Sequence, residues 1–243
     1  MSNTSNFRNA IQEAKQNALV GPNVIQNALP FLGAGLVLTA VGAWGGLKVI
    51  SNSGLQTYNA TYLPASILFI VLFISSQIAA TKGKNDVALP LLATFSLVSG
   101  YTLSLLMELA LKTPGVGETG LAIAALSCGI TFIAARPIGG NLSDEDGFAL
   151  TKTFQLGLGA LLVVVIAQAI LMWFGIITPS WMEIGISGFG VLLFVGAAVV
   201  DFFVLPRTYE DEQYLSAALS MYMTYVNLFI FILRFLIAIN SRD

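Results

Sequence analysis

Hydrophobic residues of this 243-residue chain gather in long runs that polar stretches interrupt only briefly. Seven of these runs approach the roughly 20 residues that an α-helix needs to cross a bilayer. They are Leu29–Ile50, Tyr62–Ala80, Val87–Leu111, Gly117–Ala135, Phe154–Ile177, Trp181–Leu205 and Tyr214–Ile239. The connections are short, and the longest covers Arg136–Lys152. The pattern predicts an all-α, polytopic membrane bundle of seven transmembrane helices.

A polar segment precedes the first of these runs. We therefore divide the chain into a polar N-terminal segment, residues 1–27, and a seven-helix transmembrane domain, residues 28–243. In the first part, Phe7 and Ile11 fall at helical spacing beside charged residues. This spacing fits an amphipathic helix lying at the membrane interface, and it fits a frayed tail equally well.

The composition narrows the class of protein. Hydrophobic residues make up 56% of the chain and charged residues only 10%, whereas soluble domains have about 25% charged residues. The net charge is −2 and there is no basic block, so no nucleic-acid partner is expected. The chain has no histidine and one cysteine, Cys128. These absences exclude histidine-based catalysis and an intramolecular disulfide, and we expect neither an enzyme nor a bound cofactor.

The basic residues predict how the bundle is oriented, because cytoplasmic loops carry an excess of lysine and arginine. With the N-terminus inside, seven basic residues lie on the inner side: Arg8, Lys15, Lys82, Lys84, Arg136, Lys152 and Arg207. Four lie on the outer side: Lys48, Lys112, Arg234 and Arg242. The excess favours an orientation with the N-terminus inside and the C-terminus outside.

Three ionisable residues near the predicted outer side form a candidate charge clasp. Arg234 can pair with Glu108 or with Glu183, since all three lie toward the same end of their segments. Lys112 lies four residues after Glu108 and competes for it. The sequence leaves these pairings open, and such a clasp is more often structural than part of a transport site.

Asp201 is the strongest candidate for a functional residue. It lies in the inner half of an otherwise apolar segment, and ionisable groups in such positions usually face protein or water and serve function. A carboxyl group there is a candidate for a proton-sensitive switch. The alternative is a protonated aspartic acid that is hydrogen-bonded to a neighbouring group.

A polar stripe follows on the last segment. Ser216, Ser220, Thr224 and Asn227 recur at spacings of four, four and three, which places them on one face of a helix. Because a polar stripe facing lipid is costly, we expect this face to look into the bundle. It would line a cavity there, or else join helices through hydrogen bonds.

Two stretches near the C-terminus resemble the last two helices of the Bax inhibitor-1 (TMBIM, YccA-like) membrane family. They run from Gly190 to Asp201 and from Ala218 to Arg234, and the stretch after Gly33 is similar to the first helix of that family. The resemblance implies a seven-helix fold with a central C-terminal helix. It also implies a pH-sensitive calcium leak channel that a hydrogen-bonded pair of aspartates closes.

Asp201 matches the first aspartate of that pair, but Thr224 stands where the second is expected. Two carboxyl groups titrate as a coupled pair, whereas an aspartate and a threonine cannot. The first hypothesis is therefore a calcium or cation leak, with Asp201 at the gate and as a tentative metal ligand. In this hypothesis Ser220, Thr224 and Asn227 line the path, and Ca²⁺ is the transported ion rather than a cofactor.

The second hypothesis is a non-transporting protein that binds other membrane proteins and modulates their quality control or assembly. A water-filled crevice reaching Asp201 would favour the leak, and a dry bundle core would favour the interaction protein. In both hypotheses the lipid bilayer is a partner. We expect a bacterial plasma membrane or an internal membrane.

Overall fold

The structure is a computed structural model that describes residues 19–176 and 178–241. Within these residues six long helices follow one another, with a single 3₁₀ turn, η1 (Asp211–Gln213), before the last. The helices are α2 (Val24–Thr81), α3 (Asn85–Lys112), α4 (Gly117–Gly140), α5 (Asp144–Trp173), α6 (Ser180–Thr208) and α7 (Tyr214–Asn240). All six are long and apolar enough to cross a membrane, and the described residues contain no strand. The protein is thus an all-helical, multi-pass membrane protein.

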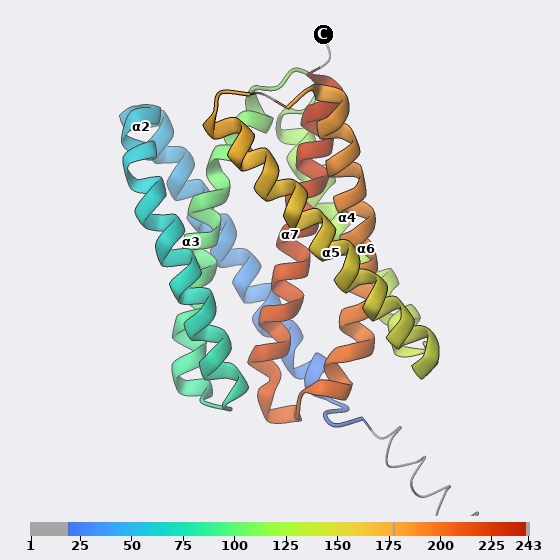
Figure 1. Cartoon of the computed structure of the whole chain (residues 1–243). Coiled ribbons are helices and arrows are strands. Elements are labelled where there is room, and N and C mark those ends of the chain that lie inside the picture. Colours follow the sequence, from blue (N-terminus) through green and yellow to red (C-terminus); the bar gives the residue numbers. More distant parts are fainter. Residues whose placement is uncertain (1–18, 177, 242–243) are drawn as a thin grey trace, which may run out of the picture.

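Helix α2 covers two of the predicted segments and the polar stretch between them. Its 58 residues would extend about 87 Å if straight, far more than the roughly 30 Å of a hydrocarbon core. The helix bends at Gly54, whose φ of 83° is left-handed and is readily adopted only by glycine. The arms formed by residues 24–53 and 55–81 fold back beside each other (Figure 1). The separating loop expected between Ile50 and Tyr62 is therefore replaced by a one-residue bend.

Helix α5 begins earlier than the hydrophobic pattern predicts. The expected connection, Arg136–Lys152, is helical at both ends, and only a short break separates α4 from α5. Ser143 caps α5 by accepting a hydrogen bond from the Asp146 backbone N–H at 3.1 Å. Acidic residues in the first turn also stabilise this helix end through its dipole. The polar loop was thus predicted wrongly, because its capping residue starts a helix ten residues before the apolar run.

The polar N-terminal segment lies mostly outside the described residues, and so does its expected amphipathic helix at Phe7 and Ile11. Its described end contacts the last turn of α6 and the connection that follows it. The Gly21 N–H donates to Pro206 O at 3.0 Å, and the Asn23 N–H donates to Asp211 Oδ1 at 2.8 Å. The chain is therefore anchored to the α6–α7 turn just before α2 begins.

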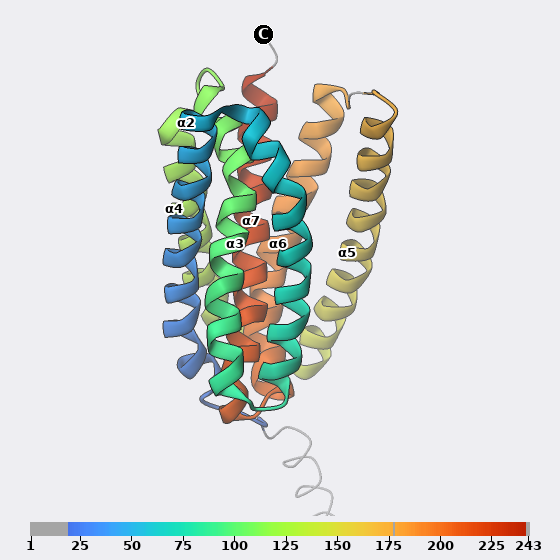
Figure 2. The same cartoon turned by 90° about the vertical axis from the view of Figure 1, so that its left-hand side faces the viewer.

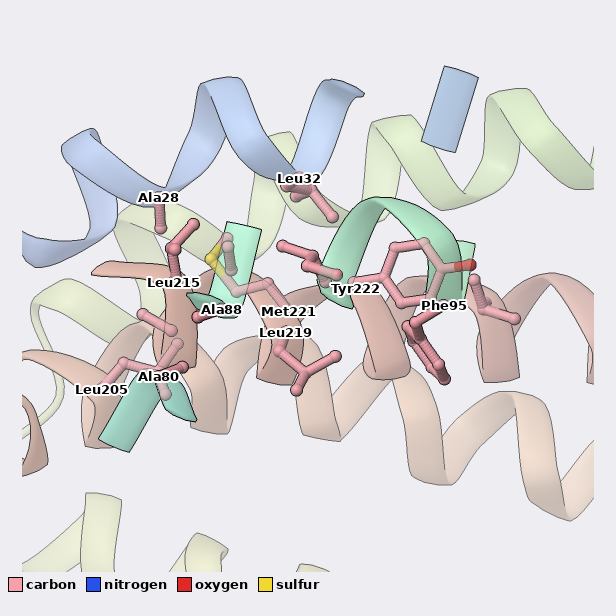
Figure 3. Close-up of a cluster of buried hydrophobic side chains, with 14 of the residues drawn as sticks. Ala28, Leu32, Ala80, Ala88, Phe95, Leu205, Leu215, Leu219, Met221 and Tyr222 are labelled. Carbon is pink, nitrogen blue, oxygen red and sulfur yellow. The ribbon is translucent and has the colours of Figure 1, made fainter. Parts of the chain in front are cut away.

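Helix α7 packs against α2, α3, α4 and α6, and it lies behind α3 in the side view (Figure 2). Figure 3 shows part of the core around it, where Ala28 and Leu32 of α2 face Leu215 and Tyr222 of α7. By contrast, α5 packs mainly against α6 and stands at the edge of the bundle (Figure 2). The fold thus places the polar stripe of α7 within protein.

Two ends of the bundle are named below. The C-terminal end is where α7 ends and α6 begins, at the top of Figure 1. The turn end is where η1 joins α6 to α7, at the bottom of the same view. Because α6 and α7 are antiparallel neighbours, each residue of α6 has a counterpart on α7 at the same level.

Candidate functional site

Asp201 lies on α6 toward the turn end and is only 8% exposed. Ser220 of α7 donates a hydrogen bond from Oγ to Asp201 Oδ1 at 3.0 Å. The other carboxylate oxygen, Oδ2, is buried and accepts no hydrogen bond from the described part of the chain. The α6–α7 interface therefore holds a carboxyl group with one satisfied oxygen and one free oxygen.

The polar stripe of α7 contributes unequally to this group. Thr224 is buried one turn beyond Ser220 on the same face of α7 and lies near the same carboxylate, but its hydroxyl makes no hydrogen bond to either carboxylate oxygen. Ser216, one turn before Ser220, is fully buried, and its hydroxyl finds no partner among the described residues. Asn227 is different, since its Nδ2 donates to Met223 O of its own helix at 2.8 Å. The structure thus brings Asp201, Ser220 and Thr224 together and keeps Asn227 apart from the carboxylate.

No cation neutralises Asp201 within residues 19–176 and 178–241. Arg207, the basic residue nearest in sequence, reaches Asp144 of α5 with Nη2 at 3.0 Å. Its Nη1 donates to Phe203 O at 2.8 Å, and its guanidinium carbon lies 3.9 Å from the centre of the Phe203 ring. These contacts hold Arg207 at the α5–α6 interface and leave Asp201 without an ionic partner.

A second polar group lies at the C-terminal end of the same interface. Arg234 of α7 bonds both oxygens of Glu183 on α6, from Nε at 2.7 Å and from Nη2 at 3.0 Å. Gln168 of α5 joins them, with Nε2 donating to Glu183 Oε2 at 3.1 Å and Oε1 accepting from Arg234 at 3.3 Å. We call these three residues the outer clasp, after the side of the membrane on which the basic residues of the sequence predict them to lie. It ties α5, α6 and α7 together with a neutralised charge.

The other pairing left open by the sequence is settled by local geometry. Glu108 bonds Lys112 one turn further along α3, with Nζ 2.8 Å from Oε1. Lys112 is 72% exposed, so this is an ordinary surface pair within one helix. Of the three residues of the predicted clasp, Glu183 and Arg234 meet, and Glu108 does not join them.

Two stacked phenyl rings separate Asp201 from the outer clasp. Phe194 of α6 and Phe231 of α7 have centroids 5.6 Å apart and an interplanar angle of 18°. Both are buried, and Phe231 lies between Asn227 and Arg234 in the α7 sequence. The polar positions along the α6–α7 interface are thus interrupted by an apolar barrier.

Two cavities open between the helices. One, of about 870 Å³, contains all three residues of the outer clasp in its wall, together with apolar side chains of α3 and α7. The other, of about 510 Å³, is largely apolar and lies between α2, α3, α4 and α7. Neither cavity reaches Asp201, Ser220 or Thr224. The structure therefore shows the Asp201 group closed off from both.

Sequence reasoning missed two polar groups. One is Gln168, which completes the outer clasp. The sequence feature that could have identified it is a single amide side chain within the apolar run of α5. The second is a buried hydroxyl pair, in which Thr39 Oγ1 and the Tyr222 hydroxyl lie 2.6 Å apart. Thr39 Oγ1 also lies 2.9 Å from Gly35 O of its own helix and 3.2 Å from Ser96 O of α3, so this group joins α2, α3 and α7.

Comparison with known proteins decides the family. A family model described as "Inhibitor of apoptosis-promoting Bax1" matches residues 21–242, nearly the whole chain. The chain belongs to the Bax inhibitor-1 family. The match includes both helices that carry Asp201 and the polar stripe, so the predicted family resemblance is confirmed.

Relatives in this family come from bacteria and eukaryotes. An uncharacterized membrane protein of Streptococcus pyogenes serotype M1 is 30% identical over 195 residues, covering 77% of each chain. Bax inhibitor 1 of Schizosaccharomyces pombe is 31% identical over 136 residues, or 51% of each chain. Mouse protein lifeguard 4 is 39% identical over 61 residues, covering 25% of this chain and 26% of its own. The similarity supports a multi-pass membrane protein of this family.

Proposed function

We propose that the chain crosses the membrane seven times, with its N-terminus inside and its C-terminus outside. The fold-back of α2 at Gly54 supports two crossings by that helix. The seven basic residues expected inside against four outside support the orientation. The turn end of the bundle is then the inner end, and the outer clasp lies toward the outer side.

We further propose that this Bax inhibitor-1 family member is a cation leak with Asp201 at its gate. The observation that carries the proposal is the buried Asp201 carboxyl group, which has a free oxygen and no cation partner among the described residues. Such a group is costly within a membrane unless an ion or a proton visits it. Calcium is the first candidate ion, because the family resemblance implies it.

The path would run along the α6–α7 interface. It would enter at the outer cavity beside Arg234 and Glu183, pass the Phe194–Phe231 barrier, and reach Asp201. The stacked rings and the closed surroundings of Asp201 then correspond to a shut state. Opening requires α6 and α7 to separate by a small movement, which would expose Asn227 and Thr224 to the path.

The proposal includes no enzymatic step and no cofactor. The residues of the path act by carrying charge and by donating and accepting hydrogen bonds. We place the protein in a bacterial plasma membrane or an internal membrane. Its obligatory partner is the lipid bilayer.

Ion flux into proteoliposomes tests the leak. We expect cation flux above that of empty liposomes, and a loss of about tenfold or more in Asp201→Asn, because the ion then lacks its counter-charge. Asp86→Asn is the matched control, since Asp86 is an exposed residue of the first turn of α3 and its loss should leave the flux unchanged. The flux is also measured at pH 6 and at pH 8. The flux through the unmodified protein should differ between the two pH values, because the Asp201 carboxyl group can gain a proton, whereas the flux through Asp201→Asn should not. No flux from folded protein would contradict the leak.

An interaction protein is the second candidate function. The closed surroundings of Asp201, which neither cavity reaches, favour it by the criterion set from the sequence, and helix α5 favours it as well. Only Gly147 and Leu161 of its 30 residues are buried, while Leu156 and Trp173 are 78% and 89% exposed. A helix that packs mainly against α6 has a broad apolar face free for another membrane helix. If no ion moves, cross-linking from cysteines placed on this face would test for a protein neighbour in the native membrane. Cross-links to lipid alone would argue against this function.

A further inference from the structure

The cavity at the C-terminal end of the bundle has the size and the lining of a ligand site. Its volume of about 870 Å³ falls within the range of about 300 to 1,000 Å³ that is usual for such sites. Its wall contains the three residues of the outer clasp among mostly apolar side chains of α3, α5 and α7. An apolar wall with a few polar groups suits a molecule that has an apolar body and a polar head.

The cavity opens toward lipid between α3 and α5. Helix α5 packs mainly against α6 and stands at the edge of the bundle (Figure 2). Leu109 of α3 and Met172 of α5 both line the cavity, and both side chains are exposed. Because exposed apolar side chains of membrane-spanning helices face acyl chains, a lipid can enter this cavity sideways from the bilayer.

The outer clasp lies at the depth where the head of a phospholipid begins. Helix α7 has 27 residues and a length of about 40 Å, so each end extends about 5 Å beyond a centred hydrocarbon core of about 30 Å. Arg234 precedes the end of α7 at Asn240 by about 9 Å along the helix axis. It therefore lies about 4 Å inside the border of the hydrocarbon core, close to the ester carbonyl groups of phospholipids.

Arg234 has hydrogen-bond donors to spare for such a carbonyl. A guanidinium group carries five N–H donors. Nε and Nη2 of Arg234 donate to Glu183 and Gln168, whereas Nη1 donates to no residue within 19–176 and 178–241. Since Arg234 lines the cavity, its Nη1 can donate to an acceptor of a bound molecule while the outer clasp stays intact.

The charge of the outer clasp favours an uncharged acceptor. Glu183 already neutralises Arg234, with Oε1 2.7 Å from Nε. The carboxylate of a free fatty acid would bring a second negative charge beside Glu183, in a place partly removed from water, which is unfavourable. An ester carbonyl accepts the same hydrogen bond without adding charge. Three residues with hydroxyl groups also line the cavity at the end of the bundle, where a polar headgroup would lie: Thr178, Ser180 and Ser241.

We propose that this cavity binds one phospholipid of the surrounding membrane. One acyl chain lies between α3 and α5, and its ester carbonyl accepts a hydrogen bond from Arg234 Nη1. The lipid fills the space between α5 and the rest of the bundle. The inference does not depend on the proposed leak, because no ion has to move; if the leak is correct, the lipid fills the outer entrance of its path in the shut state.

Native mass spectrometry of the full chain, purified in detergent and freed of lipid, tests the site. Three probes are titrated: dioleoyl phosphatidylcholine, its ether-linked analogue and free oleate. The ether analogue has the same headgroup and chains but lacks the ester carbonyl groups. We expect one tightly bound ester lipid per protein and about tenfold weaker binding of the ether analogue, as a hydrogen bond to a charged donor is lost. Oleate should also bind more weakly than the ester lipid.

A pair of variants tests the position of the lipid. Ala169→Trp narrows the cavity from α5, because Ala169 is part of its wall. Ala167→Trp is the matched control, since it makes the same change at an exposed position of the same helix that does not line the cavity. We expect Ala169→Trp to lower the affinity for the ester lipid by about tenfold and Ala167→Trp to leave it unchanged.

Three results would overturn the inference, each at a different point. Equal affinity for the ester and ether lipids would contradict the contact with Arg234. Absence of a tightly bound phospholipid, or tighter binding of oleate, would contradict the choice of ligand. Equal binding by the two tryptophan variants would place the lipid elsewhere. None of these results bears on the proposed leak, because flux is not measured. If Ala169→Trp fails to fold, the comparison of ester and ether lipids on the unmodified protein still decides.

Discussion

Glu183 and Asp201 are two carboxylates of the same helix with opposite surroundings. Glu183 lies at the C-terminal end of the bundle, accepts two hydrogen bonds from Arg234 and one from Gln168, and borders a cavity of about 870 Å³. Asp201 lies toward the turn end, accepts one hydrogen bond from Ser220, and touches neither cavity. The Glu183 carboxylate is neutralised by Arg234, whereas no described cation neutralises the Asp201 carboxylate.

The difference separates a structural role from a functional one. A compensated pair stabilises the arrangement of the helices that supply it, and removing one partner is costly because the other stays charged. An uncompensated buried carboxyl group does not contribute stability in this way. The comparison thus assigns Glu183 to the fold and Asp201 to the proposed ion path.

The largest expected effect comes from removing the barrier between these two regions. Phe231→Ala deletes a buried ring stacked on Phe194. We expect a loss of about 3 kcal/mol in the free energy of unfolding, the usual cost of such a cavity. We also expect a several-fold higher cation flux, because the path is no longer blocked. Phe148→Ala is the control, since Phe148 is 55% exposed on α5. Flux that falls or stays constant in well-folded Phe231→Ala protein would place the path elsewhere.

Breaking the outer clasp should have the next largest effect. Glu183→Gln leaves the Arg234 guanidinium without its counter-charge, and we expect a loss of about 2 kcal/mol in stability. Glu108→Gln is a matched control, because Glu108 is buried to about the same degree as Glu183 but pairs with the 72% exposed Lys112 of its own helix. Such a pair contributes at most about 0.5 kcal/mol. Thermal unfolding in detergent micelles measures both. Equal losses in the two variants would show that the outer clasp is no stronger than a surface pair.

Removing the charge at the proposed gate should affect stability least. Asp201→Asn keeps an acceptor for the Ser220 hydroxyl and removes a charge that no described residue compensates. We expect the free energy of unfolding to stay within about 1 kcal/mol of the original. A much larger loss would mean that the carboxylate contributes to packing, and would weaken the contrast with Glu183.

Much of the fold was predictable because lipid imposes a simple rule on sequence. Apolar runs of sufficient length marked every helix, although α5 begins ten residues before its run, and the polar periodicity of α7 marked its protein-facing side. The early start of α5 also had a local signal, since Ser143 precedes three acidic residues. The bend of α2 was harder to predict from the sequence, because a single glycine in a left-handed conformation takes the place of a loop.

The site was predictable where its residues lie on helices that follow one another in the chain. Helices α6 and α7 form an antiparallel pair, so the contact between Asp201 and the polar stripe follows from their connection. The contribution of Gln168 to the outer clasp depends on how α5 leans and rotates against α6, which no local pattern specifies. For the same reason the Thr39–Tyr222 contact, between the first and last helices described, was not anticipated.

A direct test of the account compares Glu183→Gln and Asp201→Asn in one experiment, each measured for thermal unfolding and for cation flux. The two substitutions make the same chemical change on the same helix. We predict that Glu183→Gln lowers the unfolding temperature while flux persists. Asp201→Asn should leave the unfolding temperature nearly constant and lower the flux by about tenfold or more. Flux that is unaffected by Asp201→Asn, or lost equally in both folded variants, would contradict the assignment of Asp201 as the gate.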